Sequence, residues 1–207
     1  MIPPLPPPAP GSPPRILLHA CCAHCLAKLL AGIPEIATAA WTPVVLWYNP
    51  NIHPLIEWRR RLKAVKMLCE RARIPLLADE TYGLLPFLRA VRDHEAPGER
   101  CDRCYALRLA RAAAEAAANS CPRFTTTLVT STHQDHSRIR AAAATAAAAT
   151  GVEFLYRDLR DAPFDPKLVH SLYKQQYCGC IFSEYDRFHP TTTHLYPPPP
   201  PRDAPPA

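Results

Sequence analysis

Seven of the nine cysteines fall into three short groups, and these groups are the part of the sequence best suited to chemistry. The groups are Cys21-Cys22-Ala-His-Cys25, Cys101-Asp-Arg-Cys104 and Cys178-Gly-Cys180. Nine cysteines placed at random in 207 residues would rarely form three such groups. Thiolates bind zinc and iron–sulfur clusters, and paired thiols carry out redox reactions. The grouping therefore predicts a metal or redox centre.

The first two groups could together supply four thiolates to one centre. Cys21 and Cys22 open one expected helix and the second group opens another, and a helix N-terminus favours thiolate. Zinc ligands are usually spaced by about two to four residues, so adjacent cysteines are unusual for zinc. In a larger cluster, each sulfur can bind a different iron. The spacing therefore favours an iron–sulfur cluster over zinc and leaves the role of Cys25 open.

The third group differs from the other two because only one residue separates its cysteines. A disulfide between Cys178 and Cys180 would close a small, strained ring, and strain makes a disulfide easier to reduce. Gly179 supplies the backbone freedom for such a turn. The pair is therefore a redox switch or provides two ligands to a second metal. Cys69 and Cys121 lie outside the groups and are expected to be structural.

The elements that must position these cysteines are predicted to form an α/β fold, a parallel sheet flanked by helices, because strands alternate with helices. The expected strands are 15–20, 44–48, 75–78, 124–130 and 153–155, and the expected helices are 21–30, 55–72, 101–118, 135–150 and 166–176. In such sheets, ligands bind outside the carboxyl ends of the strands. The first cysteine group and the Asn49–His53 turn follow the first two strands, so we expect both at one edge.

Composition limits the class of protein. With 48% apolar and 20% charged residues, the chain fits one domain, expected over 15–190. Proline-rich, disordered tails are expected over 1–14 and 191–207. The sequence shows no apolar run of about 18 residues for a membrane span and no secretory signal, so a cytoplasmic location is expected. The net charge of +6 permits a nucleic-acid partner without requiring one.

The chain resembles the QueH-type epoxyqueuosine reductases in segments that occur in the family's order. These are Leu17–Cys25, Tyr48–Pro54, Arg100–Leu109, Phe124–Leu128 and Tyr173–Cys180 with Ser183. The resemblance implies reduction of epoxyqueuosine to queuosine at the wobble position of tRNA, the last step of that pathway. It also implies a PP-loop-like (HUP) fold. Cysteines replace the glycine-rich phosphate loop after the first strand, so ATP use is not expected.

The resemblance further implies roles for individual cysteines. A 4Fe–4S cluster would be bound by Cys21, Cys22, Cys101 and Cys104. Cys178 and Cys180 would be a redox-active pair that can form a disulfide, with a second iron nearby as the competing account. The implied partners are tRNA bearing epoxyqueuosine and an electron-donor protein that the sequence does not identify.

Converting an epoxide to an alkene takes up two electrons and two protons, so the reaction needs a redox cofactor and an acid. The candidate acids are Asp158, which we place in the catalytic set with the third cysteine group, and His19 and Tyr177. Other side chains could stack on the base, bind phosphates or read the base edge. They are Tyr48, Tyr105 and Tyr177; Arg59–Lys66 and Arg100–Arg111; and Asn49, Asn51 and His53.

Three other functions compete with the reductase. A zinc-stabilised RNA-binding module would be colourless and would not respond to reductant. A thiol–disulfide oxidoreductase would use Cys22 and Cys25 and leave the other groups without a role. A tRNA sulfur-inserting enzyme would need the ATP loop that this sequence lacks.

Overall fold

The structure is a computed structural model, and it describes residues 2–190. Its five strands form one sheet in the order β3-β2-β1-β4-β5, and every neighbouring pair is parallel. The predicted α/β class with a parallel sheet is confirmed. The strands are β1 Arg15–His19, β2 Thr42–Trp47, β3 Leu76–Ala78, β4 Arg123–Thr126 and β5 Glu153–Phe154.

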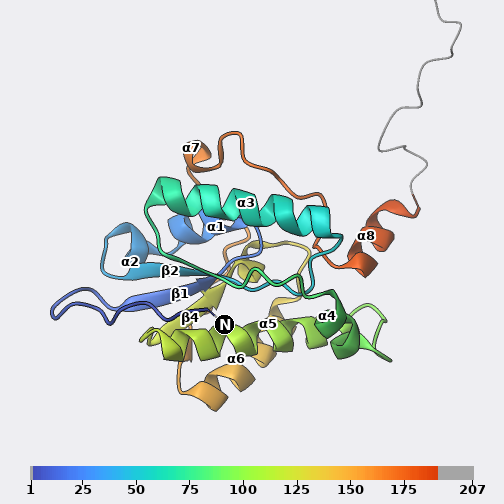
Figure 1. Cartoon of the computed structure of the whole chain (residues 1–207), viewed down its shortest axis with the longest axis horizontal. Helices are drawn as coiled ribbons and strands as arrows, with labels where there is room; N and C mark the ends of the chain where they lie inside the picture. The colour runs from blue at the N-terminus through green and yellow to red at the C-terminus, as the bar shows by residue number, and fades with distance from the viewer. Residues whose placement is uncertain (1, 191–207) are drawn as a thin grey trace, which may run out of the picture.

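Helices cover both faces of this sheet (Figure 1). Helices α1, α3 and α7 lie on one face, and α4, α5 and α6 lie on the other. The helices are α1 Ala23–Gly32, α2 Pro34–Ala37, α3 Leu55–Ala72, α4 Leu84–Val91, α5 Glu99–Ala118, α6 His136–Thr150, α7 Pro166–Val169 and α8 Ile181–Phe188, with a 3-10 turn η1 at Thr127–Thr130.

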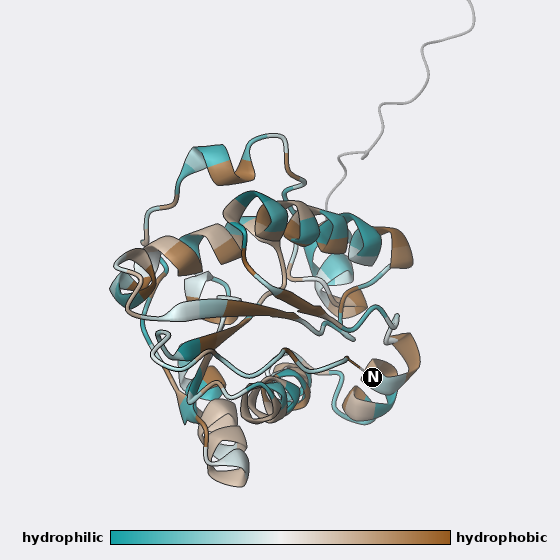
Figure 2. Cartoon of the chain, turned by 60° about the vertical axis from the view of Figure 1, so that its left-hand side comes forward, coloured by the Kyte–Doolittle hydropathy of each residue, from teal (hydrophilic) through white to brown (hydrophobic). Residues whose placement is uncertain are grey.

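The central strands are buried on both sides, as their apolar composition predicts. Leu17 and Leu18 on β1 point to opposite faces, and both are 0% exposed. Small residues of α5, such as Ala112 and Ala116, allow that helix to lie close against β1 and β4. Figure 2 shows the resulting hydrophobic layer along the strands at the centre of the molecule. This core fixes the ends of the strands, from which the cysteine segments begin.

The strand order places a topological switch point between β1 and β4. From β1 the chain continues to β2 and β3 on one side, and β4 and β5 are added on the other. Ligands of open α/β sheets bind in the crevice at the carboxyl ends of the strands at such a point. Cys21 follows β1 and Thr127 follows β4, so the first cysteine group stands at this crevice.

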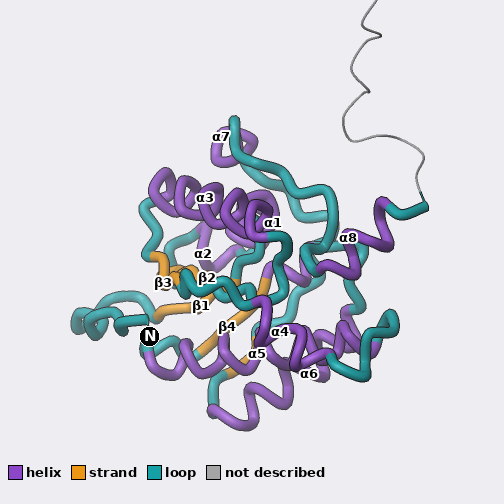
Figure 3. Tube along the Cα trace, turned by 45° about the vertical axis from the view of Figure 1, so that its right-hand side comes forward, coloured by secondary structure: helices purple, strands orange, loops and turns teal. Residues whose placement is uncertain are grey.

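The chain beyond β5 differs from the sequence prediction. The helix expected over 166–176 ends at Val169, and the segment from His170 to Cys180 is a loop that runs to α8 (Figure 3). Side chains of α3 donate hydrogen bonds to the backbone carbonyls of this loop, which a helix would have used internally. Arg71, for example, donates to His170 O at 2.8 Å. Helices α2, α4 and α8 were not predicted, and the strand expected over 124–130 ends at Thr126 and continues as η1.

The proline-rich segment at the start of the chain packs on the body, whereas the sequence predicted a disordered tail. It contains no helix or strand from residue 2 to residue 14. Leu5 N donates to Asn119 Oδ1 at 2.8 Å, and Ile2 and Leu5 pack against the core. A polyproline stretch still offers free carbonyls and isolated apolar side chains, and Arg15 Nη2 donates to one such carbonyl, Pro6 O, at 2.7 Å. The tail predicted over 191–207 lies outside the described residues.

None of the helices within residues 2–190 has the length and apolarity to cross a bilayer.

Candidate metal centre

The first cysteine group forms a triad of sulfurs. The Sγ atoms of Cys21, Cys22 and Cys25 all lie within 4.8 Å of one another. Cys22 is the N-cap of α1, and its sulfur accepts a hydrogen bond from Cys25 N at 3.3 Å. One helical turn therefore brings Cys25 back beside the cap. Such a cluster of three thiols can bind a metal ion.

Thr127 connects this triad to the other side of the crevice. Its Oγ1 accepts a hydrogen bond from Cys21 N at 3.1 Å and donates to Cys21 Sγ at 3.2 Å. The two residues are 106 positions apart in the sequence. Because β1 and β4 are paired in parallel, their following residues meet at the same edge. This hydroxyl holds the Cys21 sulfur between the ends of β1 and β4.

The three thiols of the triad have different acidities. Hydrogen bonds from Cys22 and Cys25 hold the pKa of Cys21 well below its usual range. Burial raises the pKa of Cys22, which keeps its proton. The hydrogen bond to Cys21 raises the pKa of Cys25 to about 11. Of the three sulfurs, Cys21 therefore gives up its proton most readily, and a metal bound by the triad would displace the protons of Cys22 and Cys25.

The second group lies on the first turns of α5. Cys104 is buried and Cys101 is half-buried, and neither belongs to the triad of sulfurs within 4.8 Å. Arg108, one turn further along α5, lies with Nη1 3.8 Å from Cys104 Sγ. Burial lowers the pKa of Arg108 while the sulfurs of Cys104, Cys21 and Cys178 raise it, with a net upward shift. The charge of Arg108 thus interacts with a cysteine of each group, although its direct contact is with Cys104.

Asn49 ties this guanidinium to the ends of β1 and β2. Arg108 Nη2 donates to Asn49 Oδ1 at 3.0 Å, and Asn49 Nδ2 donates to Ala20 O at 2.8 Å. The turn after β2, the residue before Cys21 and the middle of α5 are thus joined by side-chain hydrogen bonds. The prediction that the first cysteine group and the 49–53 turn share one edge is confirmed.

The third group reaches the same region from the C-terminal segment. Cys178 is exposed, and Gln134 Nε2 donates to its sulfur at 3.4 Å. Cys180 is buried, caps α8 and belongs to the same apolar cluster as Cys104. All nine cysteines are free thiols in the structure, so the two are not joined by a disulfide here.

A buried ion pair on α3 holds this segment in place. Arg61 Nε donates to Glu57 Oε1 at 2.6 Å, and both residues are buried. Arg61 also donates to the carbonyls of Tyr177 and Cys178, each at 2.9 Å. His53 N donates to Gly179 O at 2.7 Å. These contacts fix the backbone on both sides of the Cys178 sulfur.

Gly179 is required in this position, and its replacement gives a first prediction. Its φ is +133°, and an added Cβ would lie 3.1 Å from Ile52 Cγ1 and 3.2 Å from Arg61 Nη1. We expect Gly179→Ala to cost about 1–3 kcal/mol and to displace Cys178. Denaturant unfolding and the rate of thiol alkylation at Cys178 measure the two effects.

Gly151→Ala is the matched control, because Gly151 also has a positive φ of +72° but has no atom within 4 Å of an added Cβ. It should leave alkylation of Cys178 unchanged. Equal alkylation rates in Gly179→Ala and the wild type would contradict the proposed restraint.

The predicted acid Asp158 is exposed and forms an ion pair with Arg160. Hydrogen bonds from Arg160 lower the pKa of Asp158 to about 2, so the carboxyl group is ionised at neutral pH. Its catalytic role stays a prediction, and it would require displacement of Arg160. His19 is neutral because burial lowers its pKa to about 3, and its two nitrogens face Thr126 Oγ1 and Tyr48 O.

The residues predicted to read or stack on the base differ in whether their polar atoms have partners within the protein. Asn51 is 1% exposed and neither of its amide atoms has a partner among the described residues. His53 is fully buried, and its Nε2 has no hydrogen-bond partner among residues 2–190. Tyr105 is buried and donates to Gln134 Oε1 at 2.8 Å, and Tyr177 donates to His53 O. Both hydroxyls are therefore used within the protein.

The two basic clusters do not form uniformly solvated faces. Arg61, Arg100 and Arg108 are buried, so the prediction that the clusters as a whole bind phosphates is wrong for these three. Arg61 and Arg100 pair with carboxylates, and Arg108 lies beside the Cys104 sulfur. Arg59 and Lys63 remain exposed.

Three polar residues that contact the cysteine sulfurs were not predicted as part of the site. Thr127, Gln134 and Gln175 each donate to a cysteine sulfur, the last to Cys25 at 3.7 Å. Nothing in their spacing relates them to the cysteines. The Thr-rich run that contains Thr127 was instead expected to be strand throughout.

A family model described as Epoxyqueuosine reductase QueH matches residues 16–186, a range that includes every cysteine. The Epoxyqueuosine reductase QueH of Dehalococcoides mccartyi is 38% identical over 178 residues, covering 84% of this chain and 95% of that protein. The protein of the same name from Thermotoga maritima is 31% identical over 182 residues, covering 83% and 91%. That of Helicobacter pylori is 35% identical over 181 residues, covering 81% of this chain and 49% of the relative.

Proposed function

The chain belongs to the epoxyqueuosine reductase QueH family, whose members are oxidoreductases, and from this premise we propose that it reduces epoxyqueuosine to queuosine in tRNA. The observation that carries the proposal is that contacts link the three cysteine groups at the carboxyl edge of a parallel sheet: Arg108 joins Cys104 through Asn49 to the residue before Cys21, and Cys104 shares an apolar cluster with Cys180. A tRNA substrate implies that the protein acts in the cytoplasm.

The donor set fits an iron–sulfur centre. We propose Cys21, Cys22, Cys101 and Cys104 as its ligands, all thiols that lie within or next to the crevice. When bound, the centre supplies one-electron transfer, which no side chain provides. The hydrogen bonds to these sulfurs from Thr127 and Arg108 suit metal-bound thiolates, which accept but do not donate. Cys25 is the alternative ligand that the triad introduces.

We assign the exchange of the two electrons and two protons to Cys178 and Cys180. In the overall balance, both C–O bonds of the epoxide break, the oxygen leaves as water and an S–S bond forms. Oxidation of the two thiols releases the two electrons and two protons that this reduction consumes. A disulfide across one residue is strained, which favours its reduction by an electron-donor protein. Binding of a second iron by this pair is the competing role.

Asn51 and His53 are proposed to recognise the modified base. A buried amide with no partner among residues 2–190 costs free energy unless a ligand satisfies it. Both residues lie on the turn after β2, whose neighbour Asn49 contacts Arg108. A base from an anticodon loop can be splayed out and inserted into such a site.

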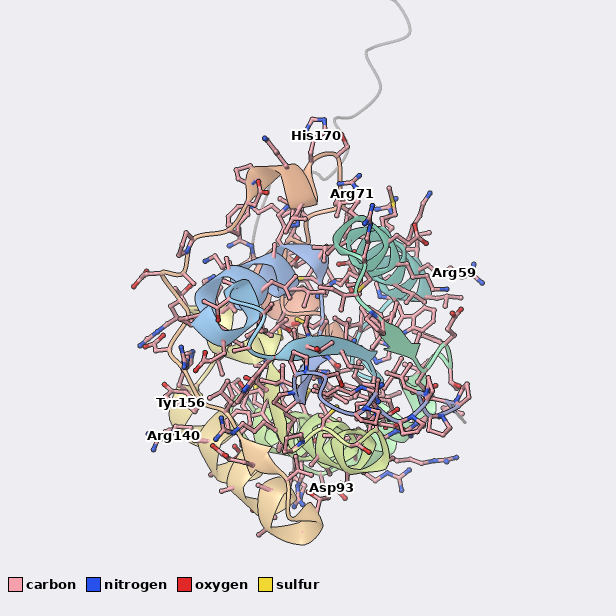
Figure 4. The ribbon with its side chains drawn as sticks, turned by 90° about the vertical axis from the view of Figure 1, so that its left-hand side faces the viewer. Arg59, Arg71, Asp93, Arg140, Tyr156 and His170 are labelled. Carbon is pink, nitrogen blue, oxygen red and sulfur yellow. The ribbon has the colours of Figure 1, made fainter. Side chains whose placement is uncertain are left out.

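Exposed cations on α3 are proposed to bind tRNA phosphates. Arg59 and Lys63 lie one turn apart, and neither forms an ion pair within the described part of the chain. They follow the turn at residues 49–54, and Figure 4 shows Arg59 directed away from the sheet. The double substitution Arg59→Gln and Lys63→Gln should weaken tRNA binding and lower the slope of log K against log salt by about one per lost contact. Filter binding at several salt concentrations measures both.

Arg140→Gln is the control for this surface. Arg140 is exposed on α6, which covers the opposite face of the sheet (Figure 4). Its replacement should leave the salt slope unchanged. If the salt slope fell equally in Arg140→Gln and in the double variant, the proposal that the tRNA phosphates bind at Arg59 and Lys63 would be wrong.

The function itself is tested with anaerobically purified protein. We expect a brown protein that contains iron and acid-labile sulfide and bleaches with dithionite. With reductant and tRNA bearing epoxyqueuosine, nucleoside mass spectrometry should show conversion to queuosine. A colourless zinc protein with no conversion would favour the RNA-binding module instead. Thiol–disulfide exchange activity without conversion of the tRNA would favour the thiol–disulfide oxidoreductase instead.

A further inference from the structure

We infer that Arg108 is the built-in counter-charge of the sulfur site, a positioning residue that stabilises an anionic metal–thiolate unit. The inference rests on the proposed function, because it requires that the cysteines bind a metal. It assigns to the guanidinium a role in retaining the metal, beyond joining Asn49 to α5.

The main observation is that Arg108 is a buried cation without a carboxylate. It is 1% exposed, and no Asp or Glu within residues 2–190 forms an ion pair with it. The other buried arginines differ in this respect. Arg61 pairs with Glu57 at 2.6 Å, and Arg100 pairs with Asp186. Among the buried arginines of residues 2–190, Arg108 alone has a sulfur in place of the carboxylate.

A guanidinium cannot lose its proton to escape this situation. Burial of an unpaired charge is costly, so a compensating anion must be close. Nη2 is used by the neutral amide of Asn49, and Nε has no partner among the described residues. The remaining contact is Nη1 with Cys104 Sγ at 3.8 Å. Among the described residues no carboxylate compensates this charge, and a metal-bound thiolate at Cys104 would supply it.

The electrostatic effect has a definite direction. A metal centre held by several thiolates is a unit with net negative charge. A fixed positive charge beside the sulfurs therefore favours the loaded site over the empty one. The hydrogen bonds of Arg108 to Asn49, and of Asn49 to Ala20, keep this charge at the crevice.

Cobalt(II) titration of the metal-free full-length protein tests the inference, because cobalt–thiolate absorption reports binding without any need for turnover. Arg108→Met removes the charge and keeps a long, unbranched side chain. We expect about 10- to 100-fold weaker cobalt binding, the range found when residues that support metal ligands are replaced. Arg108→Lys retains the charge and should lose much less affinity.

Arg111→Met is the matched control, since Arg111 is on the same helix but pairs with Asp79 and Glu115. It should bind cobalt as the wild type does. Equal affinity of Arg108→Met and wild type would overturn the inference and leave the reductase proposal intact. Equal losses in Arg108→Met and Arg108→Lys would also overturn it, because shape rather than charge would then matter. If the wild type itself gave no cobalt–thiolate absorption, the inference would be overturned, whereas the iron–sulfur centre of the proposed function is decided separately by iron and acid-labile sulfide content.

A second measurement separates the counter-charge from a purely structural role. Thermal unfolding should show a smaller metal-induced rise in Tm for Arg108→Met than for wild type. If Arg108 served only to join Asn49 and α5, its loss would lower Tm equally with and without metal. That equal loss would count against the inference even if the variant folded poorly.

Discussion

Cys101→Ala should abolish both the brown colour and the reduction of epoxyqueuosine. Cys101 is half-buried on the first turn of α5, and alanine preserves the helix at this position. The expected loss therefore reflects a missing ligand and not a broken element. Iron and sulfide content, the absorption spectrum and the yield of queuosine measure it. We expect metal content and turnover to fall together to background.

The matched variants decide which sulfurs bind the metal. Cys69→Ala removes a buried thiol of the core and should retain the colour. Cys25→Ala addresses the triad, whose three sulfurs lie within 4.8 Å of one another. If Cys25→Ala loses the colour and Cys101→Ala keeps it, the proposed ligand set is wrong, and the metal is bound by the triad instead.

Cys178→Ala should keep the metal and lose the reaction. Cys178 is exposed, and Gln134 is the side chain that donates to its sulfur, so its removal leaves the core intact. Surface changes of this kind alter stability by only about 0.5 kcal/mol. Without the first thiol, the pair cannot release two electrons, and turnover should fall on the order of 100-fold or more. The spectrum and metal content should match those of the wild type.

Gln134→Leu is a useful companion because it removes the hydrogen bond to Cys178 without removing the thiol. We expect it to retain the colour and to lose less activity than Cys178→Ala. Full activity in Cys178→Ala would remove the pair from the mechanism. Loss of the colour in that variant would make Cys178 a metal ligand.

Local sequence signals predicted the helices well where apolar residues recur at helical spacing and a capping residue marks the end of the helix. The stripe from Trp58 to Ala72 predicted a helix over 55–72, and α3 has these same bounds. Asp135 caps α6 through its side chain, and Gly151 ends it with φ of +72°. These features depend on neighbours within a turn of helix, so the sequence alone determines them.

Elements whose stability depends on distant contacts were predicted poorly. The loop that replaces the helix expected over 166–176 is held by Arg61 and Arg71 of α3. Local propensity contains no information about such partners. The same cause explains the burial of Arg61 beside the exposed Arg59, since the segment that covers Arg61 is 117 positions away.

Residue types and their spacing were enough to predict the chemical groups of the site and the parallel α/β class of the fold. How those groups meet could be seen only once the chain was folded. The sheet order places β4 beside β1, and thereby Thr127 beside Cys21. It also turns Arg108, one of several arginines in a basic helix, into a buried charge among sulfurs. Residue type and spacing follow from local sequence, whereas strand order and burial depend on packing between segments about a hundred residues apart.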